Sequence, residues 1–562
     1  MNTRDDEIYQ SITKKQVLLL FIAGSFIGGI IFILCYGVNV LNVTNDAWLL
    51  AGGDLNQHYL GWKYYRKSPW HFPIGMIDGL VYPDQLCVIF TDSIPLFAIF
   101  FKILSPILPE TFQYFGLWGI MTFCLMGGLS AVIIRKSTKN IWFCIIGSVF
   151  FSYSPYVFHR MYGHTALAGN WLILAAIGLW LYKPFFCTLK RKIIAWGLLL
   201  MAGSLVHIYY IPMIMIFMFF SCVQDIIEYR AWKNNIILLL SVIAADLALL
   251  GCTGAFSSTS SMQDGGLGEY SANLNALINS FGSSAFVKRL PANDGQYEGF
   301  GYLGFGMLIL FGIVLISSVV LLVRKSTGST RQKSENKGIK QYAFPICMIL
   351  AATAAMILAI SPTITLNSRT LLIINYPEAI TKILSIFRAS GRFIWCVGYV
   401  IMFFAVMTLA KNFKKAVSLG IIILVVILQI ADLKNFTRIG KNRTENYQHE
   451  SVFTSEQWHQ VFDGKNHLIY IPYNSLECVF GSDGIYEMAN LACDHDMTVN
   501  HFIAARIDRD NMQRHVDMIC SELESGNAVP EDTVYILDSE ETGNRLGLRT
   551  YVIDQVVVGT AQ

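Results

Sequence analysis

The residues best suited to chemistry follow the first long apolar segment, in the stretch 45–73. Asp54 comes after two glycines, which let the backbone turn tightly so that the carboxylate can project into a cavity. Such a carboxylate can act as a general base or hold a divalent cation, and the alternative is a helix cap or a solvated loop acid. His58 lies four residues later, which on a helix is the same face. It would orient a substrate hydroxyl, bind a metal or cap the acid. We predict Asp54 and His58 as the catalytic pair.

Other side chains of this stretch would contact an amphipathic substrate at the boundary between water and lipid. Polar groups that do not belong in lipid alternate there with tryptophan and tyrosine rings. For Asp46 the alternative is a helix start, because an apolar run follows it. The residues predicted to bind substrate in this stretch are Asp46, Gln57, Trp62 and Arg66.

Arginines and histidines recur where later apolar segments end. Arg160 and His164 fall at one such end, where the alternative is snorkelling to lipid headgroups. His207 lies at the end of another apolar segment, where the alternative role is to anchor the helix at the membrane interface. Arg388 and Arg392 flank a small-residue turn at the start of a helix, a combination that suits an anion. We predict that all five bind substrate. Weaker candidates are Lys288, Arg289, Glu298 and Asp432.

The composition indicates a membrane protein. Apolar residues make up 54% of the 562 residues, charged residues 14%, and the mean hydropathy is +0.47. A soluble domain carries about 25% charged residues. The apolar runs here reach about 20 residues, the length of a membrane-spanning helix. The net charge of +3 gives no field that would favour nucleic acid as a partner.

The positive-inside rule orders the apolar segments. It places the basic loops 135–139, 183–192, 324–340 and 411–415 on the side of the N-terminus. That requires 193–224 to form a hairpin and 89–108 to lie at the interface without spanning. The expected fold is an α-helical polytopic membrane protein with about eleven transmembrane helices. The expected spans are 16–38, 112–134, 141–157, 165–182, 193–208, 209–224, 235–252, 301–323, 342–360, 389–410 and 416–432.

Three parts follow from this order: a cytoplasmic N-terminus (1–15), a transmembrane domain (16–432) with an external loop (39–111), and an external tail (433–562). The tail is polar, with strand-like runs at 467–472, 533–537 and 550–558 and a helix around 508–524, which predicts a small α/β domain. Its patch 493–496 (Cys-Asp-His-Asp) contains metal-ligand types but has no distant partner. We interpret that patch as a solvated loop.

The order of parts resembles the GT-C class of integral-membrane glycosyltransferases: one span, a long external loop with an essential acid, a multi-span bundle and an external C-terminal domain. Four motifs resemble signatures of an uncharacterised bacterial membrane family assigned to that class. They are Asp54-Leu-Asn-Gln57-His58-Tyr-Leu-Gly61-Trp62, Ser68-Pro69-Trp70 followed by Pro73-x-Gly75, Arg160 with Gly163-His164, and Phe387-Arg388-Ala-Ser-Gly391-Arg392-Phe393.

The resemblance implies an inverting transferase with a polyprenyl-phosphate sugar as donor. It implies that Asp54 is the essential acid and that Arg388 or Arg392 binds phosphate. Many members of the class carry paired acids, whereas no acid is adjacent to Asp54. A divalent metal, Mg²⁺ or Mn²⁺ at Asp54, therefore stays open, and no other cofactor is expected.

The resulting hypothesis is transfer of a hexosyl or pentosyl group to a cell-surface glycan or lipid acceptor, on the outer face of the bacterial cytoplasmic membrane. Asp54 would be the base, His58 would orient it, and Arg160, His164, Arg388 and Arg392 would bind the phosphate of the sugar donor. One alternative is a lipid or glycan transporter, although transporters place ionisable groups near the midplane. Another is a surface-polysaccharide polymerase or ligase with a diphosphate-linked donor, which would need more than one arginine.

Overall fold

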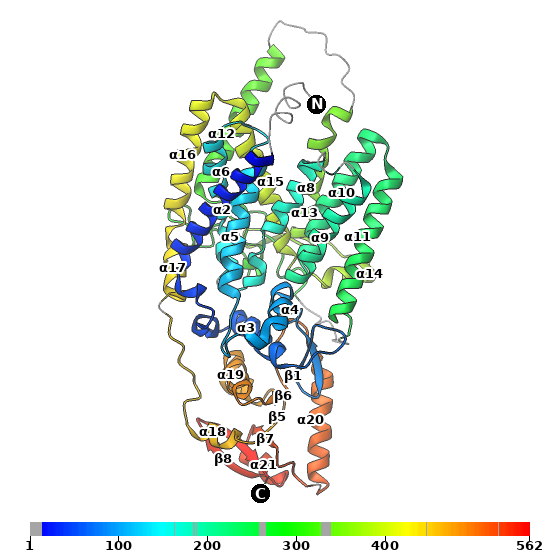
Figure 1. Ribbon diagram of the computed structural model, residues 1–562, viewed down its shortest axis with the longest axis vertical. Coiled ribbons are helices and arrows are strands. Elements are labelled where there is room, and N and C mark those ends of the chain that lie inside the picture. Colours follow the sequence, from blue (N-terminus) through cyan, green and yellow to red (C-terminus); the bar gives the residue numbers. More distant parts are fainter. Residues whose placement is uncertain are drawn as a thin grey trace.

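The structure, a computed structural model, describes residues 14–161, 163–183, 186, 188–257, 266–327, 339–445, 447–526 and 528–561. Long apolar helices form a bundle, and a small domain with a β-sheet lies at one end of it (Figure 1). The helix α2 (Lys14–Tyr36) begins at the end remote from this domain. The predicted cytoplasmic segment 1–15 lies, up to residue 13, outside the described residues.

Each apolar segment expected from the sequence contains a helix of the bundle. Within the described ranges, eight helices are long and apolar enough to cross a membrane, or nine if α6 and α7, bent by 44°, count as one span. The chain is therefore a multi-pass membrane protein. The helices after α2 are α5 (Phe115–Ile134), α6 (Ile141–Ser152), α7 (Pro155–Met161), α8 (Trp171–Leu181), α9 (Leu189–Val206), α10 (Tyr210–Tyr229), α11 (Trp232–Thr253), α12 (Phe305–Thr327), α13 (Ala343–Ile360), α15 (Ile394–Asn412) and α16 (Lys415–Asp432).

The number of spans stays a prediction, because two of the expected segments form unusual helices. The helix α8 has 11 residues, and α9 carries three basic residues in its first turn. The run 193–224 is divided, as expected, into α9 and α10, with a break at 207–209. Segment 89–108 contains α4 (Pro95–Leu104), a helix of 10 residues. At 1.5 Å per residue it covers about 15 Å, half of a hydrocarbon core.

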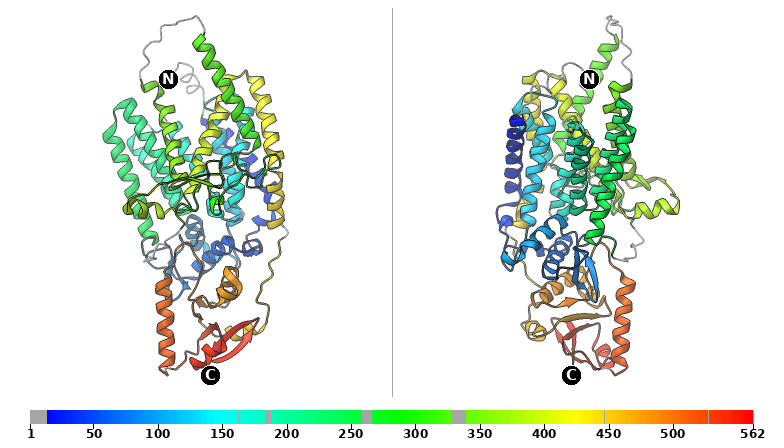
Figure 2. Two further views of the ribbon diagram at one scale, coloured as in Figure 1. Left: turned by 180° about the vertical axis from the view of Figure 1, so that it is seen from behind. Right: turned by 45° about the vertical axis from the view of Figure 1, so that its right-hand side comes forward.

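A thin layer separates the bundle from the C-terminal domain. It contains α3 (Asp54–Lys67), α4 and the antiparallel hairpin of β1 (Met76–Val81) and β2 (Asp84–Cys87) (Figure 1). A second antiparallel hairpin, β3 (Thr363–Leu366) and β4 (Arg369–Ile373), and the amphipathic helix α14 (Glu378–Ser385) project sideways from the bundle (Figure 2, right). The chain that leaves α14 returns to the bundle at the turn before α15.

The tail begins with α17 (Lys434–Thr444), which packs on α2; the Thr444 hydroxyl donates to the Tyr36 carbonyl at 2.7 Å. The α/β domain predicted for the rest of the tail is confirmed. Its mixed sheet has the order β6-β5-β7-β9-β8, with β5 parallel to both β6 and β7. The elements are α18 (Gln457–Phe462), β5 (His467–Ile471), α19 (Ser475–Asp494), β6 (Thr498–Val499), α20 (Arg509–Glu524), β7 (Thr533–Leu537), α21 (Glu540–Arg545), β8 (Arg549–Ile553) and β9 (Val556–Thr560).

The C-terminal domain docks on α3 through the patch 493–496. Lys63 pairs with Asp494 at 2.5 Å, and Lys67 pairs with Asp496 at 2.6 Å. The side chains of Asp494 and Asp496 are 53% and 82% exposed, so the patch is solvated, as expected, and its acids also serve as the counter-charges of α3. Partly exposed pairs of this kind contribute about 0–1 kcal/mol each, so they fix the position of the domain more than they stabilise it.

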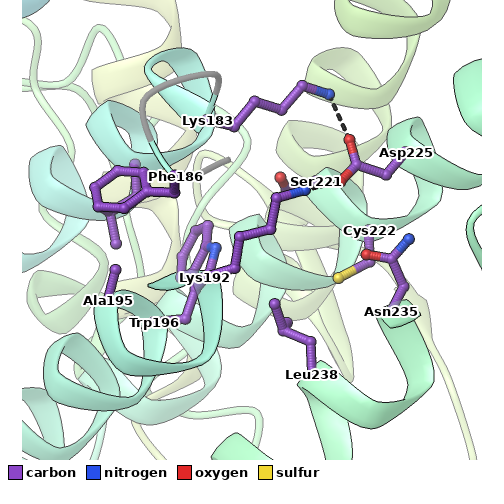
Figure 3. A pocket seen from close by; sticks show the side chains of 11 residues that line it. Lys183, Phe186, Lys192, Ala195, Trp196, Ser221, Cys222, Asp225, Asn235 and Leu238 are labelled. Carbon is purple, nitrogen blue, oxygen red and sulfur yellow. Dashed lines mark hydrogen bonds and ion pairs between the residues drawn. The ribbon is translucent and has the colours of Figure 1, made fainter. Parts of the chain in front are cut away.

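At the opposite end of the bundle, charges gather around a cavity of about 10 Å³ (Figure 3). Lys183 and Lys192 both pair with Asp225, at 2.7 and 2.6 Å. A cavity of that size holds about one water molecule at most. This cluster therefore joins α9 and α10 to the connection after α8. The cavity beside it is too small for a substrate.

Candidate active site

A cavity of about 260 Å³ lies between the bundle, the thin layer and the C-terminal domain. Its wall combines carboxylates, guanidiniums, imidazoles and tyrosine rings from segments far apart in the sequence. The polar and aromatic residues that line it are Asp54, Gln57, Phe90, Asp92, His164, His207, Tyr209, Tyr270, Tyr297, Glu298, Ser385, Arg388, Arg392 and Arg506.

Asp54 reaches the cavity because the chain turns sharply just before α3. Gly52 and Gly53 have φ values of +99° and +63°, which only glycine adopts freely. The amide N–H of Gly53 donates to Oδ1 of Asp483 in α19 at 3.1 Å, so the C-terminal domain holds this turn. Asp54 then begins α3 with its side chain open to the cavity. The expected tight turn and projecting carboxylate are both present.

Asp54 is well suited to accept a proton. Burial within the cavity raises the pKa of Asp54 to about 6, and the charges of Asp92 and Glu298 add to the increase, whereas Arg392 and Arg160 oppose it. A carboxylate with a pKa close to neutrality is a stronger base than an ordinary surface aspartate, yet it is still ionised at pH 7.

The motif glycine of α3, Gly61, allows the turn 91–93 to lie directly against the helix. A Cβ added to Gly61 would meet Thr91 Cβ at 2.3 Å and Ser93 Oγ at 2.5 Å. Ser93 Oγ donates to the His58 carbonyl at 2.7 Å, which fastens the turn to the same helix. Gly61 therefore determines where Asp92, the middle residue of the turn, is held.

We expect the Gly61→Ala variant to lose about 1–3 kcal/mol of stability, the usual effect of an added methyl group in a filled core. Thermal unfolding of the detergent-purified protein measures this. Gly197→Ala in α9 is the control, because a Cβ there meets no atom within 4 Å. Alanine should make that helix more stable by up to about 1 kcal/mol. Equal melting temperatures for the two variants would contradict the close approach at Gly61.

Imidazoles surround the carboxylate of Asp92. His164 Nε2 lies 3.4 Å from Asp92 Oδ2, and His207 Nε2 lies 3.3 Å from Asp92 Oδ1. Gln57 Nε2 donates to Asp92 Oδ2 at 3.4 Å. The ring of His58 lies 4.7 Å from that of His164, centroid to centroid.

The three imidazoles are neutral at pH 7. Burial lowers the pKa of His58 to about 3, and His164 adds to the decrease. Burial, with the positive charges of Arg392 and Arg160, holds the pKa of His164 well below its usual value. Burial also lowers the pKa of His207, against the attraction of Asp92. Neutral imidazole is the form that accepts hydrogen bonds and binds metal ions.

Glu298 joins two arginines at the wall of the cavity. Its Oε2 accepts from Arg160 Nη2 at 2.5 Å and from Arg392 Nε at 2.9 Å. Burial alone would raise the pKa of Glu298, but the two guanidiniums outweigh it and hold the pKa well below the usual range. The guanidinium of Arg392 also lies over the ring of Tyr209, 4.5 Å from its centroid.

Two further arginines face the cavity from outside the bundle core. Arg388 lies three residues after the end of α14 and is exposed to solvent. Arg506 belongs to the C-terminal domain and lies over the ring of Phe90, with Cζ 5.4 Å from the centroid. The adjacent amide N–H of Ala505 donates to the Phe90 carbonyl at 2.9 Å. The C-terminal domain thus supplies one side of the cavity.

Most of the chain matches a described protein family. Residues 25–434 match the family described as "Domain of unknown function (DUF6311)", and residues 457–561 match the DUF6311 C-terminal domain. The chain belongs to this family. No curated protein gives a significant match. Among solved structures, this DUF6311 protein is similar to the archaeal oligosaccharyltransferase AglB from Archaeoglobus fulgidus, in complex with an inhibitory peptide and a dolichol-phosphate. That match has a TM-score of 0.43 and 10% sequence identity, and it covers 92% of this chain and 69% of that chain.

The DUF6311 fold brings most of the residues predicted from the sequence to one place. His58 lies behind the cavity wall, fully buried, and Arg160 lies behind Glu298. Glu298, a weaker candidate in the sequence, proves to be the centre of the arginine pair. The predicted residues that line the cavity are Asp54, Gln57, His164, His207, Arg388 and Arg392.

Three predicted substrate-binding residues of the DUF6311 protein lie outside the cavity and hold the fold together. Asp46 accepts from the Tyr59 hydroxyl at 2.7 Å. Trp62 is buried, and its indole N–H donates to the Phe112 carbonyl at 2.8 Å. Arg66 donates to the carbonyls of residues 109 and 110, at 2.8 and 2.7 Å. These contacts give the three residues of the stretch 45–73 a structural role that needs no substrate.

Two charged residues of the cavity wall, Asp92 and Arg506, were not predicted from the sequence. In the sequence, Asp92 falls within the segment 89–108, which is expected to lie at the interface. Its setting between Thr91 and Ser93 in an otherwise apolar stretch could have marked it as a site residue. Arg506 has no comparable signal, because nothing around it in the tail distinguishes it from a solvated arginine.

Proposed function

We propose that this protein is a GT-C type glycosyltransferase that moves a sugar from a polyprenyl phosphate to a glycan or lipid acceptor. The observation that carries the proposal is the cavity, which combines Asp54 with the arginines 388, 392 and 506 and with tyrosine rings. Guanidiniums suit phosphate oxygens. Aromatic rings suit the apolar faces of a sugar. The cavity would face the outer side of a bacterial cytoplasmic membrane, the same side as the C-terminal domain.

The proposed reaction is a direct displacement at the anomeric carbon. Asp54 takes the proton of the acceptor hydroxyl, whose oxygen forms the new glycosidic bond. The bond between the anomeric carbon and the phosphate oxygen breaks, and its electron pair leaves with the polyprenyl phosphate. Arg388 and Arg392 stabilise the charge that collects on this phosphate. One displacement inverts the configuration of the sugar.

The direct test is donor binding and transfer by the detergent-purified protein. Polyprenyl phosphate should raise the melting temperature of the wild type, because it binds the folded state. The Arg388→Ala variant should bind it about 10–100-fold more weakly, the usual effect of losing a charged hydrogen bond. The control is Arg369→Ala, on the exposed strand β4 and outside the cavity. The proposed phosphate site would be overturned if polyprenyl phosphate raised the melting temperature of both variants equally, or did not raise that of the wild type.

The arginines favour a second candidate, a polysaccharide polymerase or ligase with a diphosphate-linked donor. Arg388 approaches from the bundle side and Arg506 from the C-terminal domain, so two phosphates could be held between them. Polyprenyl diphosphate should then stabilise the protein more than the monophosphate does. The extra stabilisation should disappear in Arg506→Ala. Equal effects of both lipids would leave the monophosphate reaction as the better proposal.

A further inference from the structure

A cluster of possible metal ligands lies at the inner wall of the cavity. His58 from α3, Asp92 from the turn before α4 and His164 from the connection after α7 each offer one ligand atom, and these atoms lie within 4.8 Å of one another. Asp92 and His164 line the cavity, and His58 lies behind them. Three segments that are distant in the sequence thus converge on one point.

The hydrogen bonds of His58 leave one ring nitrogen ready to bind a ligand. His58 Nδ1 lies 3.0 Å from Thr165 Oγ1, and either atom can be the donor; in the tautomer with the proton on Nδ1, that N–H donates to Thr165. Nε2 then carries a lone pair, and among the described residues it has no hydrogen-bond partner although it is completely buried. A buried nitrogen without a partner is unfavourable unless something else satisfies it. Metal-bound histidines show this arrangement, with the second nitrogen hydrogen-bonded to an orienting group.

His207 holds Asp92 through Oδ1, the carboxylate oxygen that does not face His164. His207 Nδ1 accepts from the amide N–H of Tyr209 at 3.2 Å, so in the neutral ring the proton is on Nε2. That Nε2–H faces Asp92 Oδ1. His207 is therefore a positioning residue. Asp92 and Ile94 both have positive φ values, 54° and 52°, and for isoleucine this is a strained conformation. Such strain is often kept where a side chain must have a fixed direction.

We propose that His58, His164 and Asp92 form a binding site for a divalent transition-metal ion of the zinc type. Two imidazole nitrogens and one carboxylate oxygen match the three protein ligands of a catalytic zinc site. Mg²⁺ prefers oxygen ligands, so this mixed set suits an ion of the zinc type better than Mg²⁺. His164 Nε2 and Asp92 Oδ2 are 3.4 Å apart. Two ligands on a tetrahedral zinc ion are separated by about 3.3 Å, given bonds of about 2.0–2.1 Å.

The charges of the cavity suggest what the ion does. The lining carboxylates (Asp54, Asp92 and Glu298) balance the lining guanidiniums (arginines 388, 392 and 506). A divalent ion would give the cavity a net positive charge. Beyond its three protein ligands it would take an oxygen of an anionic ligand such as a phosphate. This role rests on the proposed function, whereas the binding of the ion does not.

The test measures zinc in the full-length protein without any sugar donor. Detergent-purified protein is stripped with a chelator, dialysed against a slight excess of Zn²⁺ and desalted, and bound zinc is counted by mass spectrometry. We expect about one tightly bound ion in the wild type and a loss of more than about tenfold in Asp92→Asn and in His164→Gln. The control is His495→Gln. His495 and His459 form an exposed imidazole pair in the C-terminal domain, 2.8 Å apart, which is the obvious competing zinc ligand.

Two further readouts guard against a folding defect in the variants. Zn²⁺ should raise the melting temperature of stripped wild type and of His495→Gln, but not that of Asp92→Asn. Co²⁺ in the wild type should give the visible absorption of a four- or five-coordinate site with nitrogen and oxygen ligands. No retained zinc and no cobalt spectrum in the wild type, or zinc that disappears in His495→Gln and persists in Asp92→Asn, would overturn the site. Because no donor is present, those results would leave the transfer reaction untouched.

Discussion

Replacing Asp54 with asparagine is expected to lower sugar transfer by about 10²–10⁴-fold, the usual contribution of a positioned general base. The amide keeps the size of the side chain but cannot take the proton of the acceptor hydroxyl. Stability should be unchanged or higher, because the charge that burial and the nearby Asp92 and Glu298 oppose is removed. Transfer of a labelled sugar from a lipid-linked donor measures the loss, and thermal unfolding measures the stability.

Asp46→Asn is the matched control, since Asp46 lies in the same loop and outside the cavity. That variant should transfer sugar at close to the wild-type rate. Full activity in Asp54→Asn, with Asp46→Asn behaving as expected, would remove Asp54 from the mechanism and with it the main support for the proposed reaction.

The pH profile of the wild type tests the same role independently. The reactive form is the carboxylate, and the pKa of Asp54 is raised to about 6. The rate should therefore fall about tenfold per pH unit below that value and level off above it. An ordinary aspartate would give an inflection near pH 4. A flat profile between pH 5 and 7 would contradict a base with a raised pKa.

Replacing Glu298 with glutamine is expected to destabilise the protein by about 3–5 kcal/mol, because it leaves two buried guanidiniums without a counter-charge. Arg160 and Arg392 have side chains that are only 6% and 9% exposed, so water cannot replace the carboxylate. Chemical or thermal unfolding in detergent measures the loss. Removing the negative charge should also lower the pKa of Asp54, and the inflection of the pH profile should move down with it.

The control for this variant is Glu378→Gln on α14. Glu378 pairs with Lys382 at 2.7 Å, but both side chains are exposed, 82% and 69%. An exposed pair of this kind contributes about 0.3–0.5 kcal/mol. Both variants replace Glu with Gln, so the difference between their losses of stability measures the effect of burying a shared carboxylate. Similar losses in the two variants would show that Glu298 is not the centre of a buried charge network.

The class of the fold and the location of the site follow from local patterns in the sequence. Apolar runs of helical length require a membrane bundle, since the backbone must satisfy its own hydrogen bonds in lipid. The change to polar, strand-like runs after residue 432 marks the C-terminal domain. Residues that cannot lie in lipid, such as Asp54, Arg388 and Arg392, were correctly expected at the edge of the bundle. The glycines at 52 and 53 predicted the turn that presents Asp54.

The contacts between distant segments are decided only by the tertiary structure. Asp92 becomes a site residue because Gly61 allows its turn to lie against α3. Arg160 becomes a support for Glu298, and Trp62 and Arg66 become ties to backbone carbonyls. The local sequence around such residues looks the same whether the side chain meets a substrate or a carbonyl. Which partner each polar group contacts depends on how distant segments pack, such as α3, the turn 91–93 and the C-terminal domain.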